Sequence, residues 1–168
     1  YWISISLTFD EYFKFLIPIA TILVPSFLAI FYGVTTYLFA IFYSKKVVLS
    51  FLIFSILLGT IELIRGFIFT GFPWNLIAFS FSNNTDFIQI LSIIGTYSFN
   101  LICISFFICP AVLILKRSKK EILMCSLFIF IAIGFLVYGN IKSDQFNTIK
   151  SNSHNYIVRA VSPNIKLN

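Results

Sequence analysis

Four long apolar stretches dominate this sequence and leave the chain few ways to fold. They run over residues 15–42, 47–69, 87–115 and 122–138. A helix needs about 20 residues to cross the hydrocarbon core of a bilayer, with a usual range of about 17–25. Because a spanning helix satisfies its own backbone hydrogen bonds, such runs cross a membrane as helices. The sequence therefore predicts an all-α polytopic membrane bundle.

The composition requires lipid as the solvent for much of the surface. Of the 168 residues, 59% are hydrophobic and 11% are charged, and 22 are Phe. A soluble domain is about 45–50% apolar and about 25% charged. Too few polar groups are available to cover such a chain in water, so a soluble protein with a very apolar core is disfavoured.

Three prolines predict irregularities in two of these helices. Pro18 and Pro25 lie in the first stretch, and Pro110 lies near the end of the third. Proline removes a backbone donor and clashes with the preceding turn. We therefore expect the N-terminal part of the first stretch to be kinked or interfacial. We also expect a bend near Pro110.

Basic residues indicate how the helices are threaded. Lys45 and Lys46 lie in the first connection, and residues 116–120 contribute four more basic side chains in the third. The second connection, residues 70–86, has no Lys or Arg. Since positive connections stay in the cytoplasm, the second connection and everything after Tyr138 are expected outside. The net charge of +6 is thus explained by topology, and no nucleic-acid partner is expected.

The character of the sequence changes near residue 139. We assign residues 1–139 to the membrane domain, with the end of a preceding helix at its start, and residues 140–155 to a polar linker. Residues 156–161 read as a β-strand followed by a turn, which predicts the start of a soluble domain over residues 156–168. The chain begins mid-pattern at Tyr1 without a signal peptide. We expect it to be a fragment of a longer protein.

No catalytic or metal-binding set is visible in the sequence. The three cysteines, Cys103, Cys109 and Cys125, lie in apolar stretches without metal-ligand spacing, and we expect them to be buried and inert. His154 lies in the polar linker and is expected to be solvated. No cofactor or metal is expected.

The main anomaly is a pair of opposite charges inside the second apolar stretch. Glu62 and Arg65 are three residues apart, so they share a helical face and are able to pair. Each charge costs about 2.5–3.5 kcal/mol at the centre of a membrane helix. Two interpretations stay open. Either Arg65 snorkels to the outer interface and Glu62 neutralises it, or the two side chains form a polar face that lines a site.

A constrained turn follows directly. Gly71 and Pro73 suit a tight exit from the helix, and Phe72 and Trp74 suit the headgroup level. An ordinary interface anchor explains these residues alone. The closeness of the turn to the charge pair argues for a site instead.

The start of the third stretch carries small and polar side chains. Gly95 and Ser98 permit close helix packing. Tyr97 and Asn100 are able to hydrogen-bond across helices, although packing is their expected role.

These residues carry a resemblance to a known family. The run E-L-I-R-G at residues 62–66, continuing into F-T-G-F-P-W-N at 69–75, resembles the E-x-x-R-G…TG-x-PW signature of the apolipoprotein N-acyltransferases. Residues 161–165 are similar to the Q-x-N-I start of that family's nitrilase-like domain, with Ser162 where Gln is usual. Residues 1–4 resemble the segment after the family's early helices.

The resemblance implies an architecture and an activity. Family members have N-terminal helices in the bacterial inner membrane, then an extracytoplasmic α/β nitrilase-like domain, then a last helix. They move an acyl chain from a phospholipid to a Cys thiol, and then to the N-terminal amine of a diacylated lipoprotein. The catalytic Glu, Lys and Cys belong to the nitrilase-like domain, so none is expected in this chain. The fragment alone is expected to be inactive.

By this resemblance, a set of residues near the outer end of the second helix is expected to line a lipid-entry cleft under the catalytic domain: Glu62, Arg65, Gly71, Phe72, Pro73, Trp74 and Asn75. The expected partners are a phospholipid donor, a diacylated lipoprotein acceptor and the bilayer. Competing interpretations are a transporter or channel subunit, a membrane scaffold, and an inactive gene remnant.

Overall fold

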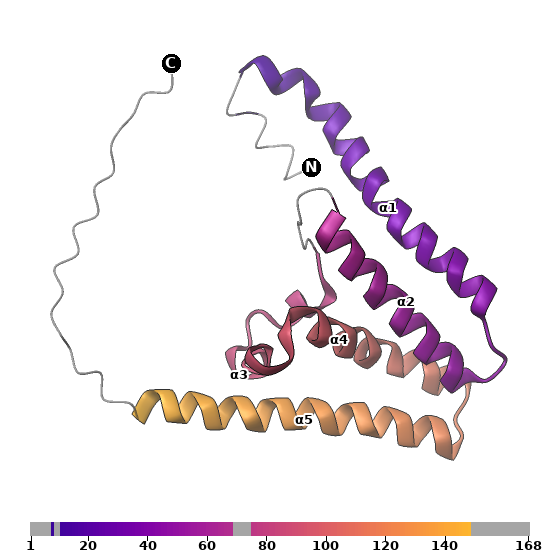
Figure 1. Cartoon of the computed structure of the whole chain (residues 1–168), viewed down its shortest axis with the longest axis vertical. Helices are drawn as coiled ribbons and strands as arrows, with labels where there is room; N and C mark the ends of the chain where they lie inside the picture. Colours follow the sequence, from indigo (N-terminus) through magenta and orange to yellow (C-terminus); the bar gives the residue numbers. More distant parts are fainter. Residues whose placement is uncertain (1–7, 9–10, 69–74, 149–168) are drawn as a thin grey trace, which may run out of the picture.

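The described part of the chain is helical. The computed structural model describes Thr8 and residues 11–68 and 75–148, and no strand occurs among them (Figure 1). The elements in chain order are η2 (Glu11–Leu16), α1 (Ile17–Phe42), α2 (Val47–Phe67), η4 (Ile77–Phe81), α3 (Thr85–Ile88), α4 (Leu91–Leu115) and α5 (Lys119–Thr148). The strand predicted at 156–161 and the rest of the predicted soluble start at 156–168 lie outside these residues.

The long helices are long enough to cross a membrane. Among the described residues, four helical segments are long and apolar enough to cross a bilayer: Glu11–Phe42, Val47–Phe67, Leu91–Leu115 and Lys119–Phe146. This confirms the predicted helical membrane bundle.

The first helix stands partly apart from the others. It lies beside α2 (Figure 1), and Thr35 is its only buried residue. Pro18 falls in its first turn, where the missing amide would have no partner in any case. The residues just before it form the 3-10 helix η2, so the start of the first stretch departs from an α-helix. The apolar side chains that α1 leaves exposed suit contact with lipid.

The third predicted helix is divided. The expected span 87–115 separates into the short α3 and the long α4, and within α4 the backbone leaves helical geometry at Gly95 (φ 75°, ψ 168°). Only glycine adopts such a conformation readily. A Cβ built on Gly95 meets nothing within 4 Å, so the predicted packing role for this residue is wrong. The break in helical geometry lies at Gly95, and Pro110 lies inside α4.

The last helix is longer than the sequence predicted. The expected span 122–138 becomes α5, which continues to Thr148, so residues 140–148 of the predicted linker are helical. No proline interrupts this segment, and Lys142 donates to Gln145 one turn on (3.3 Å), so the helix propagates beyond its apolar part. Residues 149–155 lie outside the described range.

Two buried clusters hold the bundle together. The larger joins the connection between α2 and α4 to the helices beneath it, and consists of Leu76, Ala78, Phe87, Ile90, Phe99 and Cys103. The smaller lies near the lysine-bearing connections and consists of Phe51, Cys109, Val112 and Cys125. All three cysteines are buried free thiols, as predicted.

Candidate functional site

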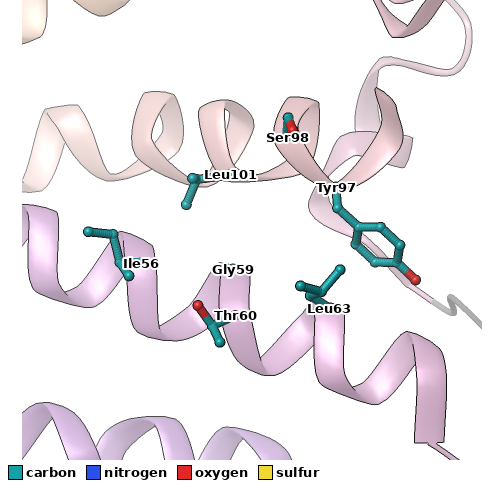
Figure 2. A pocket seen from close by; sticks show the side chains of 7 residues that line it. All are labelled: Ile56, Gly59, Thr60, Leu63, Tyr97, Ser98 and Leu101. Atoms are coloured by element: carbon teal, nitrogen blue, oxygen red, sulfur yellow. The ribbon is translucent and has the colours of Figure 1, made fainter. Parts of the chain in front are cut away.

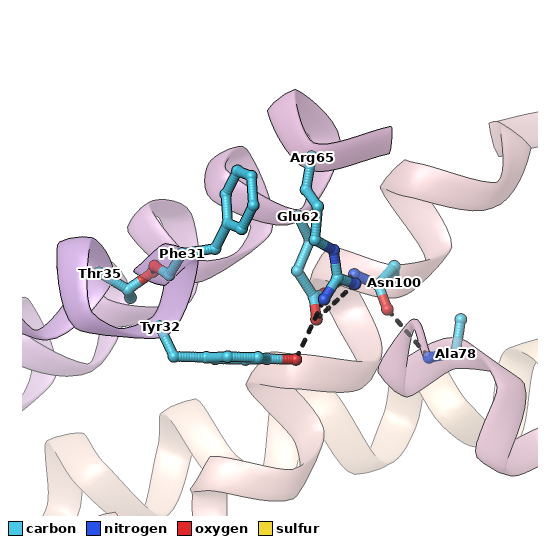
Figure 3. A network of polar contacts seen from close by, with 7 residues as sticks. All are labelled: Phe31, Tyr32, Thr35, Glu62, Arg65, Ala78 and Asn100. Atoms are coloured by element: carbon cyan, nitrogen blue, oxygen red, sulfur yellow. Dashed lines mark hydrogen bonds and ion pairs between the residues drawn. The ribbon is translucent and has the colours of Figure 1, made fainter. Parts of the chain in front are cut away.

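The two charged residues of α2 face the interior of the bundle (Figure 3). Glu62 is 1% exposed and Arg65 is 6% exposed. Arg65 Nη2 lies 3.8 Å from Glu62 Oε1, which forms the pair that their spacing allowed. Because Arg65 is buried, the interpretation in which it snorkels to the interface is wrong.

An asparagine from α4 completes this pair and extends it to a third element. Asn100 is fully buried, and its Nδ2 donates to Glu62 Oε2. Its Oδ1 accepts the backbone N–H of Ala78 at 2.9 Å. Asn100 therefore connects the end of α2 to η4, the first helical element after the predicted turn. From the sequence, Asn100 was expected to act mainly in helix packing. Its position as an amide inside an apolar stretch was the signal that could have indicated a polar role.

A tyrosine from α1 contacts the same group. Arg65 Nη1 donates to Tyr32 Oη at 3.3 Å, and the guanidinium carbon lies 5.9 Å from the Tyr32 ring centroid. This contact brings α1 into the network. No sequence pattern marked Tyr32, because a tyrosine in an apolar stretch is common near membrane interfaces.

The buried charges of this cluster compensate one another. A charge buried without a partner is strongly destabilising, whereas a pair with added hydrogen bonds is tolerated. Among the described residues, Glu62 Oε1 has no hydrogen-bond partner, so Arg65 is the group that compensates it. We name the cluster of Tyr32, Glu62, Arg65 and Asn100 the polar network.

The glycine after Arg65 has a steric role. Gly66 is buried, and a Cβ built on it falls 1.8 Å from Tyr97 Oη and 2.8 Å from Tyr97 Cζ. A larger residue at this position would force the Tyr97 side chain of α4 away from the end of α2. The Tyr97 ring also lies 5.8 Å, centroid to centroid, from that of Phe67. The R-G pair in the motif thus combines a buried cation with a close helix contact.

A shallow groove runs along α2 and α4 (Figure 2). Its volume is about 200 Å³, and it is lined by Ile56, Gly59, Thr60, Leu63, Tyr97, Ser98 and Leu101. Gly59 brings the two helices close, since a Cβ there would lie 2.8 Å from Leu101 Cδ1. The mostly apolar lining suits a hydrocarbon chain.

The predicted turn is described only at its end. Asn75 is exposed and has a positive φ of 51°, which asparagine tolerates better than most residues. Gly71, Phe72, Pro73 and Trp74 lie outside the described residues. Both flanks of the turn are nevertheless held, because the Ile68 amide donates to the Ile64 carbonyl and the Ala78 amide donates to Asn100.

Within residues 11–68 and 75–148, no group of three or more His, Cys, Asp or Glu side chains is placed to hold a metal ion.

Comparison with known proteins places these features in a family. The family described as the apolipoprotein N-acyltransferase N-terminal domain matches residues 1–109. The apolipoprotein N-acyltransferase of Rickettsia prowazekii (strain Madrid E) is 36% identical over 168 residues, which covers 98% of this chain. That of Rickettsia typhi is 33% identical over 171 residues, and that of Brucella melitensis biotype 1 is 28% identical over 166 residues, each covering 98% of this chain.

The match covers only part of these relatives. The chain spans about a third of their length, at 32%, 32% and 31% respectively. No solved structure matches the chain.

Proposed function

Because this chain belongs to the apolipoprotein N-acyltransferase family, we propose that it forms the membrane part of an enzyme that acylates lipoproteins. The reaction moves an acyl chain from a phospholipid to the N-terminal amine of a diacylglyceryl-Cys lipoprotein. The catalytic Glu, Lys and Cys of the family belong to a nitrilase-like domain, of which residues 156–168 are the start. Residues 1–139 are the membrane domain, and this chain alone is inactive.

The enzyme lies in the bacterial inner membrane. The lysine-bearing connections face the cytoplasm, and the connection between α2 and α4 faces outward with the C-terminal tail. The distribution of Lys and Arg supports this threading. With this threading, the polar network and the predicted turn at residues 69–75 lie on the same side of the membrane as the catalytic domain.

The turn forms one wall of a lipid-entry cleft beneath that domain. Its members are Gly71, Phe72, Pro73, Trp74 and Asn75, with Glu62 and Arg65 underneath. The single observation that carries this proposal is the polar network, which joins α1, α2, α4 and η4 at the base of the turn. A network of buried hydrogen bonds fixes the geometry of what stands on it.

Glu62 and Arg65 act as positioning residues in this proposal. Both side chains are buried and engaged with one another, which favours support of the turn over direct contact with a lipid headgroup. Aromatic side chains of the turn pack against the lipid, and the groove beside Leu63 and Leu101 accepts an acyl chain. Small displacements of positioning groups cost large factors in rate.

The test uses a chimera that contains a catalytic domain. Residues 1–168 of this chain replace the matching segment of the Rickettsia prowazekii relative, with which they align over 98% of their length. N-acylation of a diacylated lipopeptide is followed by mass spectrometry in vesicles. Asn100→Ala and Trp74→Ala are expected to lower the rate by roughly tenfold to a hundredfold.

The matched control is Asn83→Ala, which removes an exposed amide from the same connection. It is expected to leave the rate within roughly twofold, since exposed surface changes are nearly neutral. Normal rates for Asn100→Ala and Trp74→Ala at normal protein levels would contradict the cleft proposal. A chimera with no activity in unsubstituted form, although folded and inserted, would contradict the proposed membrane role.

A further inference from the structure

A second, larger pocket lies at the lysine-bearing end of the bundle. Its volume is about 480 Å³, and it opens between the first turns of α2 and α5. Four lysines line it: Lys45 and Lys46 from the first connection, Lys116 from the third, and Lys120 from the start of α5. Two connections about 70 residues apart in the sequence therefore contribute basic residues to the lining of one cavity.

One carboxylate is present in this pocket and is already engaged. Glu121 is the acidic residue of the lining. Its Oε2 accepts the hydroxyl of Ser118, the residue that directly precedes α5. Four lysines and one carboxylate thus line the pocket, and the carboxylate is hydrogen-bonded to Ser118 at the start of α5. The lining therefore has a net positive charge.

Backbone donors add to this excess. α2 begins at Val47, and the preceding Lys46 makes no side-chain capping hydrogen bond. Val47, Val48 and Leu49, whose amides open the helix, line the pocket. The first amides of a helix have no intrahelical partner and carry the positive end of the helix dipole. The start of α2 therefore adds a partial positive charge beside the lysines, which favours an anion such as a phosphate.

The rest of the lining is apolar and runs along the first turns of α2. Val48, Leu49 and Leu52 form this side of the pocket along α2. Leu49 and Leu52 are 44% and 41% exposed, which leaves the wall open to a hydrocarbon chain. A basic rim over an apolar wall matches a ligand with an anionic head and an acyl tail, and a free phosphate would leave the apolar wall unused.

From this arrangement we propose that the pocket binds the headgroup phosphate of an anionic phospholipid from the leaflet that surrounds the lysine-bearing connections. The lysines hold the phosphate, and an acyl chain lies along Leu49 and Leu52. The site is distinct from the lipid-entry cleft, which lies at the other end of α2. It rests on membrane insertion alone and does not depend on the acyl-transfer proposal.

The first test measures lipid retention by the full chain. The protein is reconstituted in nanodiscs of phosphatidylcholine with a minor fraction of phosphatidylglycerol, and bound phosphatidylglycerol is counted by native mass spectrometry after release. Lys116→Gln with Lys120→Gln is expected to lower retention by roughly tenfold, because each lysine near a surface contributes measurably to anionic-lipid attraction. The matched control, Arg117→Gln with Lys119→Gln, removes two charges from the same segment but none from the pocket lining.

The two double variants separate a site from diffuse attraction. If retention falls only in the pocket variant, a built site is supported. If both variants lose phosphatidylglycerol equally, the lysines act through the general field of the connection, and the proposal is overturned. Equal retention by the wild type and the pocket variant would overturn it as well.

A second variant keeps every charge and fills the cavity. Leu52→Trp is expected to reduce retention by roughly fivefold or more by occupying the apolar wall. Its control is Ile64→Trp, which lies on the same helix with the same 41% exposure and outside this pocket. Unchanged retention in Leu52→Trp would contradict the proposal.

A competition arm identifies the source of the phosphate. Inorganic phosphate and glycerol phosphate, added at millimolar concentration, are expected to leave retention unchanged because they lack the acyl chain. Displacement of phosphatidylglycerol by inorganic phosphate at that concentration would assign the pocket to a soluble anion and overturn the lipid proposal.

Discussion

The two ends of the α2 and α4 pair differ in how far their polar and charged residues are buried. At one end, Glu62, Arg65 and Asn100 are buried, and they join α1, α2, α4 and η4. At the other end, Lys46 and Lys116 are exposed and surround a cavity of about 480 Å³. Both ends belong to the same two helices.

This difference separates two uses of charge in a membrane protein. Buried charges must be compensated by neighbouring groups, so they fix the arrangement of the helices. Exposed lysines keep their water and remain available to set topology or to bind a ligand. We therefore expect substitutions in the polar network to change stability and those at the lysine end to change lipid binding.

The largest effect is expected from breaking the buried ion pair. Glu62→Leu leaves the Arg65 guanidinium without its carboxylate, and we expect the free energy of unfolding to fall by about 3–5 kcal/mol. Glu121→Leu at the lysine end should cost clearly less than Glu62→Leu, because it removes the acceptor of the Ser118 hydroxyl and leaves no buried cation behind. Denaturant unfolding in detergent micelles measures both variants.

A double variant sharpens this contrast. Adding Arg65→Leu to Glu62→Leu removes the stranded charge and should recover most of the lost stability. A double variant no more stable than Glu62→Leu would mean that Arg65 is compensated by other groups, and the contrast between the two ends would weaken.

The next effect concerns a glycine of α5 at the end where the polar network lies. A Cβ built on Gly139 falls 1.8 Å from the backbone carbonyl oxygen of Asp86, which cannot move aside as a side chain does. Gly139→Ala is expected to destabilise the fold by about 3 kcal/mol, at the upper end for overpacking. At Gly134, on the same helix, nothing lies within 4 Å of the built Cβ.

The thermal midpoint of each alanine variant provides the measurement. Gly134→Ala should be neutral or slightly stabilising, because alanine favours the helix. An equal loss in both variants would show that the contact between α3 and α5 does not depend on Gly139.

The smallest effect is expected at the start of α5. The Ser118 hydroxyl donates to Glu121, and together they match the S-x-x-E pattern of a helix start. Ser118→Ala should cost about 1 kcal/mol. Ser126→Ala, which removes an exposed hydroxyl within the same helix, should stay within about 0.5 kcal/mol. A cost for Ser118→Ala equal to that of Glu62→Leu would contradict the difference between the two ends.

Much of the architecture follows from hydrophobicity alone. Apolar length located all four spanning helices, and α2 ends two residues before its expected boundary. Length does not reveal where a helix breaks or continues, which explains the missed interruption at Gly95 and the extension to Thr148. Gly95 needs a conformation set by tertiary structure, and the extension depends on polar residues that favour helix and linker alike.

The site was only partly predictable for a related reason. Glu62 and Arg65 stand out because a charge is costly in an apolar stretch, and their spacing allows a pair. Asn100 and Tyr32 join them through contacts between helices that are distant in sequence. A helix that is apolar on every side gives no indication of which face meets its neighbour, so these partners required the structure.

The central claim is that the polar network holds the connection after α2 in place through the hydrogen bond from the Ala78 amide to Asn100. Amide hydrogen exchange of the full chain in nanodiscs, read by NMR at Ala78, tests it most directly. In Asn100→Ala, exchange at Ala78 should accelerate by roughly tenfold or more, while Asn83→Ala leaves it unchanged. Equal protection of Ala78 in the wild type and Asn100→Ala would contradict the account.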